Sequence, residues 1–171
     1  MTVTPDGFDA APIDGDDLVA AERLIRRRRT SLLMDPERAV PDAVVERLVD
    51  LVAWAPNHKR TWPWHVAWVT GDARARLGDV AADAMAARGD EAFKVDKTRR
   101  KYLRAPGMLV IGSDPGDSDL RRIENRDAVA AGVQNLLLGA TAAGLASFWS
   151  SCPKGAERPV ADWCGFPDGT A

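Results

Sequence analysis

A long run without a charged side chain, from Ala128 to Trp149, places the strongest constraint on what this chain can fold into. About 20 consecutive apolar residues can cross a bilayer, so the run has to be a membrane span or a buried helix. The second is favoured because the run is rich in Ala and Gly, and Gly144 stands where it would end a helix. The run also contains the polar residues Gln134, Asn135 and Thr141. We therefore predict a helix that lies in the core of a soluble protein or at a subunit interface.

The rest of the composition is that of one ordinary domain. The 171 residues fit a single domain, and a formal net charge of −2 offers no overall basic surface for nucleic acid. Residues 1–15 are acidic, contain Pro and Gly and lack a long apolar segment, which predicts a mobile arm and no signal peptide. The two cysteines, Cys152 and Cys164, lack CxxC spacing and a neighbouring pair of histidines. We expect reduced thiols in the cytoplasm and no metal site.

Hydrophobic periodicity predicts helices and strands interleaved along the chain, with more helices than strands. The expected helices cover residues 16–29, 41–53, 72–88, 90–103, 123–143 and 157–164. The expected strands cover residues 64–69, 108–111 and 145–149. The gaps between these strands are too irregular for a repeated βαβ array, so the pattern indicates an α+β domain.

The two histidines differ in their surroundings. His65 lies inside the expected strand 64–69, where an imidazole at the core edge or facing solvent is the simplest interpretation. His58 lies in a loop bounded by prolines, beside Lys59 and Arg60, and loops carry binding residues more often than cores do. A surface side chain and a ligand contact both remain open for His58.

Four consecutive arginines, Arg26 to Arg29, end the first expected helix. Cations at this position interact favourably with the helix dipole, which is the simpler interpretation. A phosphate clamp is the alternative, because guanidinium groups match phosphate oxygens and Thr30 adds a hydroxyl donor.

Tryptophan is abundant, with six residues in the chain. Four of them lie between Trp54 and Trp68 and can serve as core packing or as the wall of a flat pocket. Trp149 is followed by Ser150 and Ser151, and small polar residues after a strand can present backbone N–H groups to a ligand.

Several segments of the chain resemble the motifs of one family, and they occur in the same order as in that family. Arg28-Arg29-Thr30 is similar to the Arg-Arg-Ser signature of the nitroreductase family. The next two motifs of this family are a loop and a strand. They are similar to Ala55-Pro56-Asn57-His58-Lys59 and to Trp62-Pro63-Trp64-His65-Val66 of this chain. The family's "RAP" segment is similar to Arg104-Ala105-Pro106. Its central helix and the strand beside the flavin are similar to the segments that contain Gln134-Asn135 and Gly144 to Trp149. The resemblance covers about residues 16–166 and is strongest to the short, single-domain subgroup.

The resemblance implies an α+β sandwich with a central, mostly antiparallel sheet flanked by helices, built as an intertwined homodimer with FMN at the subunit interface. The uncharged helix would lie at that interface. Carried over by position, Arg28, Arg29 and Thr30 would bind the FMN phosphate and ribityl chain. His58 would contact the flavin from the partner subunit. The flavin ring would be lined by Trp149, Ser150 and Ser151.

The implied activity is a two-step exchange in which NAD(P)H reduces the flavin and a nitroaromatic, quinone or related small acceptor is then reduced, with no metal. This chain departs from the pattern at Thr30, where the family has Ser, at Trp62, where it has Gln, and at Trp54. Family members continue past the equivalent of Phe166 into a further strand and a tail. We therefore expect residues 16–171 to form the family's domain without this C-terminal strand and tail.

Two other functions remain open at this point. A protein of the same fold can bind or sequester flavin without turning over NAD(P)H. An interaction protein that uses the Arg26–Arg29 helix on an acidic partner or nucleic acid would bind in a salt-sensitive way and carry no chromophore.

Overall fold

The computed structural model describes residues 15–171. The arm expected over residues 1–15 lies outside the described residues, except that Gly15 opens the first helix. The helices are α1 (Gly15–Arg27), α2 (Asp42–Asp50), α3 (Ala73–Ala87), α4 (Ala92–Lys101), α5 (Asp119–Ala142) and α6 (Glu157–Trp163). Three short 3-10 turns are η1 (Leu51–Trp54), η2 (His58–Arg60) and η3 (Tyr102–Arg104). The strands are β1 (Trp64–Thr70) and β2 (Gly107–Ser113).

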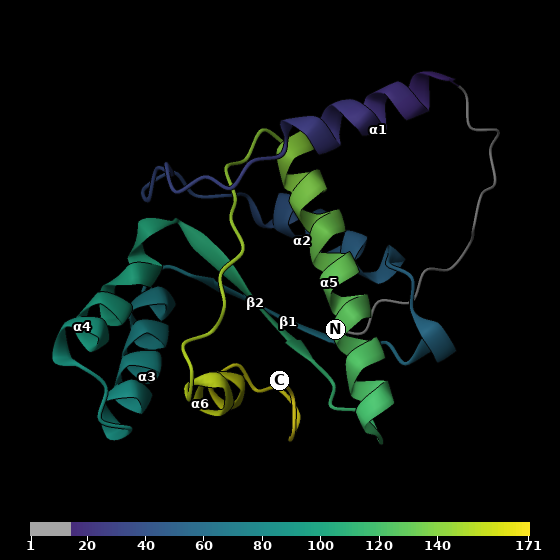
Figure 1. Ribbon diagram of the computed structural model, residues 1–171. Helices are drawn as coiled ribbons and strands as arrows, with labels where there is room; N and C mark the ends of the chain where they lie inside the picture. The colour runs from purple at the N-terminus through teal and green to yellow at the C-terminus, as the bar shows by residue number, and fades with distance from the viewer. Residues whose placement is uncertain (1–14) are drawn as a thin grey trace.

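The two strands form an antiparallel pair in the middle of the molecule (Figure 1). Their register runs from Trp64 opposite Ser113 to Thr70 opposite Gly107. Gly107 is required there because a Cβ would lie 2.0 Å from the ring of Trp68. Within residues 15–171 the sheet has these two strands, so the expected antiparallel sheet is confirmed in direction, although it is small.

Helix α5 is the long helix that the uncharged run predicts. It begins four residues earlier than expected, at Asp119, because the Ser118 side chain caps it by accepting a hydrogen bond from the Arg121 N–H at 3.2 Å. It ends as expected: Gly144 has a φ of 71° and donates to Thr141, while the next N–H donates to Ala140. No helix in residues 15–171 is long and apolar enough to cross a membrane.

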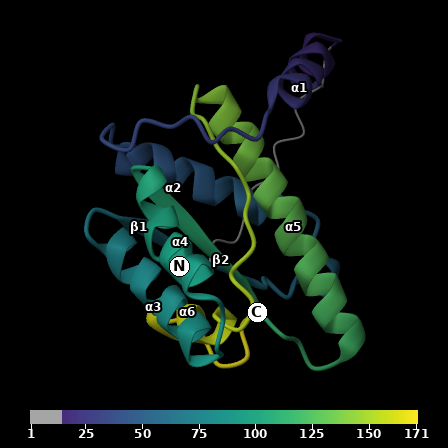
Figure 2. The same cartoon turned by 60° about the vertical axis from the view of Figure 1, so that its left-hand side comes forward.

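The core is divided by the sheet. One cluster joins α5 to α2, η1 and Trp64, and it includes Val52, Val133 and Leu136. A second cluster joins α3 and α6 to the other part of the sheet. Figure 2 shows the same division, with α5 on one side of the strands and α3, α4 and α6 gathered on the other.

The expected strand 145–149 is wrong. This segment is an extended connection that leaves the end of α5, passes the sheet and reaches α6 (Figure 1). It makes one isolated parallel bridge, between Thr30 and Ser147, and the Ser31 N–H donates to the Ser147 carbonyl at 3.1 Å. Its residue types suit a strand, but it has no adjacent strand with which to continue pairing.

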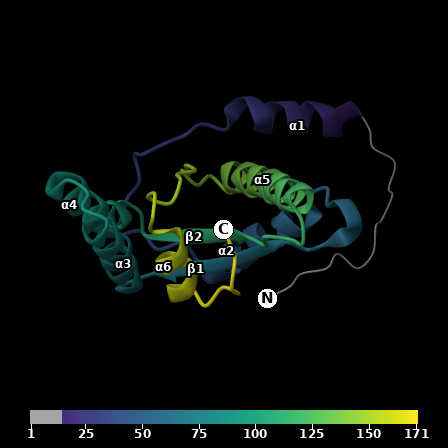
Figure 3. The ribbon, with the colours of Figure 1, turned by 60° about the horizontal axis from the view of Figure 1, so that its bottom comes forward.

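Helix α1 is amphipathic as expected, but its apolar face is not covered within residues 15–171. None of its residues is buried, and Leu18 and Ile25 are 64% and 56% exposed. Figure 3 shows α1 as a separate outer layer above α5. The predicted helix 16–29 ends two residues early, at Arg27, and the predicted helix 41–53 tightens into η1 after Asp50.

We expect Gly132→Ala to destabilise the domain. A Cβ at Gly132 would lie 2.7 Å from a methyl group of Val52 and 2.9 Å from its carbonyl oxygen, so α5 would have to move away from η1. The cost should be about 1–2 kcal/mol in the free energy of unfolding, after the gain of about 1 kcal/mol in helix propensity. Urea denaturation measures it.

The matched control is Gly15→Ala, because a Cβ at Gly15 has nothing within 4 Å. Its free energy of unfolding should stay within about 0.5 kcal/mol of the wild type. Equal losses in both variants would contradict the close approach of α5 to η1.

Candidate functional site

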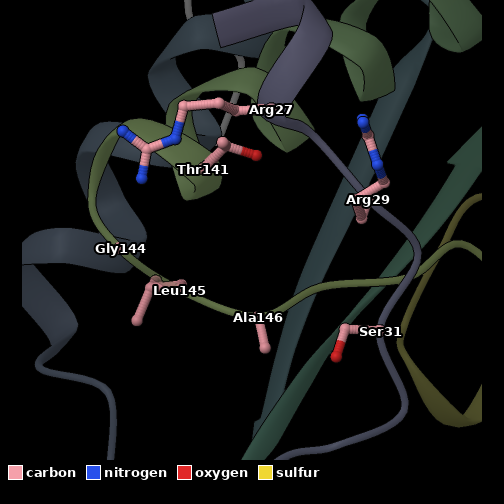
Figure 4. A pocket seen from close by; sticks show the side chains of 7 residues that line it. All are labelled: Arg27, Arg29, Ser31, Thr141, Gly144, Leu145 and Ala146. Atoms are coloured by element: carbon pink, nitrogen blue, oxygen red, sulfur yellow. The ribbon is translucent and has the colours of Figure 1, made fainter.

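A cavity of about 240 Å³ lies where the C-terminal ends of α1 and α5 meet (Figure 4). Arg27 closes α1, Arg29 and Ser31 follow it, and Thr141 belongs to the last turn of α5. The remaining lining comes from the turn and connection after α5: Gly144, Leu145 and Ala146. The parallel bridge at Thr30 and Ser147 fixes the two segments side by side.

This end of the molecule is strongly cationic. The ends of α1 and α5 together contribute roughly one unit of partial negative charge, which four consecutive guanidinium groups outweigh. Arg29 serves as a helix cap, because its Nη1 donates to the carbonyls of Arg26 and Arg28. Arg27 has no hydrogen-bond or ion-pair partner among the described residues, so its charge is available to a ligand.

The two arginines at the cavity are not arranged as a closed clamp. In Figure 4 the guanidinium group of Arg27 lies on the side of the turn at Gly144, whereas that of Arg29 lies on the other side of the view and points away from this turn. Binding one anion with both groups requires a rotation about the side-chain bonds of at least one of them. Ser31 can contribute a hydroxyl from the edge of the cavity.

The structure brings only part of the predicted phosphate set to this cavity. Arg29 lines it, but Arg28 and Thr30 do not. Arg27, which belongs to the arginine cluster considered as a phosphate clamp, also lines it, as does Ser31, which the sequence did not single out. An extended segment places alternate residues on the same side. Because the four arginines are identical, the sequence does not indicate which of them face the cavity.

The predicted ring-lining residues lie elsewhere. Trp149, 59% exposed, borders a second cavity of about 430 Å³ between β2 and α5. Arg126 and Asp127 of α5 supply charge there, Ser113 supplies a hydroxyl, and Ala171 also lines the cavity. Ser150 and Ser151 are exposed and border neither cavity.

His58 lies near the opposite end of α5. Its Nδ1 is 2.9 Å from a carboxylate oxygen of Glu124, and its carbonyl accepts a hydrogen bond of 3.3 Å from Arg121. Arg121 also pairs with Glu124 at 2.8 Å. Lys59 and Arg60 are exposed beside it. The sequence placed these three basic residues in a loop, and the structure makes that loop a short 3-10 turn.

Within one chain, the arginine end and the His58 end are far apart. Seventeen residues of α5 separate Glu124, which contacts His58, from Thr141, which lines the cavity near Arg27. At 1.5 Å per residue these two positions are about 26 Å apart along the helix. The residues of one chain therefore do not form a single site.

Other candidates take structural roles. His65 pairs with Asp114 at 2.6 Å and lies against the ring of Phe166, which agrees with the core-edge interpretation. Trp64 is buried and packs edge-on against Trp62, whereas Trp54 is exposed.

The two cysteines offer no thiolate at neutral pH. Burial raises the pKa of Cys164 to about 11. Burial, followed by the nearby Glu157 carboxylate, raises the pKa of Cys152 to about 11, although the residue as a whole is exposed. Both are free, and no cluster of potential metal ligands occurs in the described part of the chain.

Comparison with known proteins places these features in a family. The model of the Nitroreductase family matches residues 25–171. YdjA of Escherichia coli K12, provisionally named an NAD(P)H nitroreductase, is 29% identical over 133 residues, which cover 77% of this chain and 72% of YdjA. A nitroreductase-like family protein of Bacillus cereus is 26% identical, with a TM-score of 0.70 over 87% of this chain and 79% of that one.

A solved structure of NfnB from Mycobacterium smegmatis, described as an FMN-dependent nitroreductase in complex with NADPH, also has a TM-score of 0.70. It covers 88% of this chain and 83% of NfnB at 22% identity, which shows the shared fold. The family match spans most of the chain and includes both α5 and the arginine end. This chain belongs to the Nitroreductase family.

Proposed function

We propose that this protein is an FMN-dependent oxidoreductase that takes hydride from NADH or NADPH and passes electrons to a small acceptor such as a nitroaromatic or a quinone. The observation that carries the proposal is the cationic cavity of Arg27, Arg29 and Ser31 in a chain of this family. Names of the relatives support the same reaction class: YdjA is named for NAD(P)H, and NfnB for FMN.

The residues at the cavity fit the phosphate end of FMN. Two guanidinium groups and a hydroxyl are donors of the kind that phosphate oxygens accept. The volume of about 240 Å³ holds a phosphate group, whereas sites for whole cofactors span about 300–1,000 Å³. We therefore assign only the phosphate and the start of the ribityl chain to this cavity.

The flavin ring would be held by residues from two chains. The exposed apolar face of α1 supports a homodimer, because Leu18 and Ile25 are uncovered in one chain. The distance of about 26 Å along α5 supports a site to which His58 comes from the partner subunit. Trp149, Ser150 and Ser151 remain the proposed ring-lining residues, and Arg28 and Thr30 remain candidates beside Arg29.

In this proposal the chemistry belongs to the bound cofactor, which exchanges hydride and electrons between the two substrates. Arg27 and Arg29 neutralise the phosphate charge, and Ser31 donates a hydrogen bond. Lys59 and Arg60 provide positive charge near His58 that would stabilise anionic character on the ring. No side-chain nucleophile is needed, which agrees with the raised pKa values of Cys152 and Cys164. The free thiols favour a cytoplasmic location.

The visible absorption spectrum tests this function. Purified protein loaded with FMN should show a flavin band, and anaerobic addition of NADH or NADPH should bleach it. A band that persists with both donors would favour the alternative, a flavin-binding or sequestering protein without this donor chemistry. Protein that takes up no FMN would contradict both.

Arg27→Gln should weaken FMN binding more than Arg28→Gln. Arg27 lines the cavity and has no partner among the described residues, whereas Arg28 lies outside the lining. Loss of one charge-assisted contact should raise the dissociation constant about tenfold or more, measured by quenching of FMN fluorescence.

The pair of variants is its own control, because both remove one positive charge from the same helix end. The reverse order of effects would show that Arg28, and not Arg27, faces the phosphate.

A further inference from the structure

The loop between α2 and β1 has an unusual backbone. Three residues that are not glycine have positive φ angles: Lys59 at 65°, Arg60 at 53° and Trp62 at 50°. Side chains with a Cβ are disfavoured in this region, so the surrounding structure has to hold the loop in place. Residues of this kind cluster at functional sites, and this loop carries His58.

A short network of polar side chains, half-buried in the loop and buried on α5, holds the loop. The Asn57 side chain accepts a hydrogen bond from the Trp62 N–H at 3.0 Å and donates one to the Thr61 hydroxyl at 3.1 Å. The Thr61 hydroxyl donates to the Asn125 side chain at 2.7 Å. Both ends of the strained segment are therefore connected to α5 through Thr61.

Asn125 is the inner end of this network. It is only 2% exposed and occupies the buried face of α5, next to Ala128 and Val129. Its amide nitrogen donates to the Asp114 carbonyl at 3.2 Å, so it joins three segments: α5, the loop and the end of β2. A buried amide costs free energy unless it is hydrogen-bonded, and both polar atoms of this amide have partners.

The neighbouring turn of α5 orients the imidazole. Arg121, Glu124 and Asn125 are three and four residues apart and therefore share one face of the helix. Glu124 binds His58 Nδ1 and Arg121 binds its carbonyl, while Asn125 holds Thr61. A single helix face thus holds both the backbone of the loop, at His58 and Thr61, and the direction of the imidazole.

We propose that Asn125, acting through Thr61, is a positioning residue of the flavin site: it holds the strained loop so that His58 and Lys59 are presented to the cofactor bound by a second copy of the chain. The inference rests on the proposed function for its cofactor. The holding of the loop itself is independent of any ligand and can be measured separately.

Thr61→Val tests the proposal in the full chain. The variant keeps the shape of the side chain but removes the hydroxyl between Asn57 and Asn125. Thr61→Ser keeps the hydroxyl and should restore wild-type behaviour. Thr70→Val is the matched control, because it removes a single hydroxyl contact, to the Pro106 carbonyl. Thr70 lies at the far end of β1, about 20 Å from the end of the strand that is next to the loop.

Two measurements are made on each variant. The first is the rate of native-state trypsin cleavage after Lys59 or Arg60, located by mass spectrometry. It should rise about tenfold in Thr61→Val and stay near wild type in Thr61→Ser and Thr70→Val. The second is the dissociation constant for FMN, which should rise about tenfold in Thr61→Val alone. If Thr61→Val does not fold, Asn57→Ala removes the acceptor of the Trp62 N–H and takes its place.

The outcomes separate the inference from the function on which it rests. Faster cleavage with unchanged FMN affinity would overturn the positioning role and leave the proposed function standing. Unchanged cleavage would overturn the holding role of the network. A wild type that binds no FMN would overturn the proposed function and the positioning role with it, whatever the cleavage rates.

Discussion

The close packing of α5 against η1 is the contact on which the rest of the structure depends. Gly132 lets the helix approach the Val52 backbone so closely that a Cβ does not fit, and Asn135 donates to the Leu51 carbonyl at 3.2 Å. This contact explains why the face of α5 toward η1 lacks charge and contains small residues: a larger side chain there would hold the helix away from η1. A long straight helix fixed in this way also sets the distance between the groups at its two ends.

That distance decides how a site can be built. The cationic cavity lies at the C-terminal end of α5 and the His58 loop near its N-terminal end, about 26 Å apart. A rigid helix does not bring them together within one chain. One chain leaves the apolar face of α1 uncovered and the two groups along α5 separate, and the proposed second copy of the chain would account for both.

Sequence reasoning located α5 and both strands well, because long apolar runs and alternating residues between Gly and Pro signals carry most of that information. It placed a strand at 145–149 that does not form, since the residue types there suit a strand but pairing depends on a neighbour that sequence does not supply. The sequence identified the cluster of four arginines but could not tell which of them lines the cavity, because identical neighbouring side chains carry no pattern that distinguishes them. The contact between Asn125 and Thr61 was not predicted, because the two residues are 64 positions apart and a tertiary contact of this kind leaves no local pattern.

The central claim is that the flavin site combines the arginine end of one chain with the His58 loop of another. The most direct test is a mixed dimer, purified with two different tags, in which one chain carries Arg27→Glu and the other carries His58→Ala. A composite site predicts that one of the two sites collects both defects while the other is intact, so the dimer binds one FMN with wild-type affinity. If each chain forms its own site, both sites carry a defect, and a mixed dimer that binds no FMN with wild-type affinity would contradict the account.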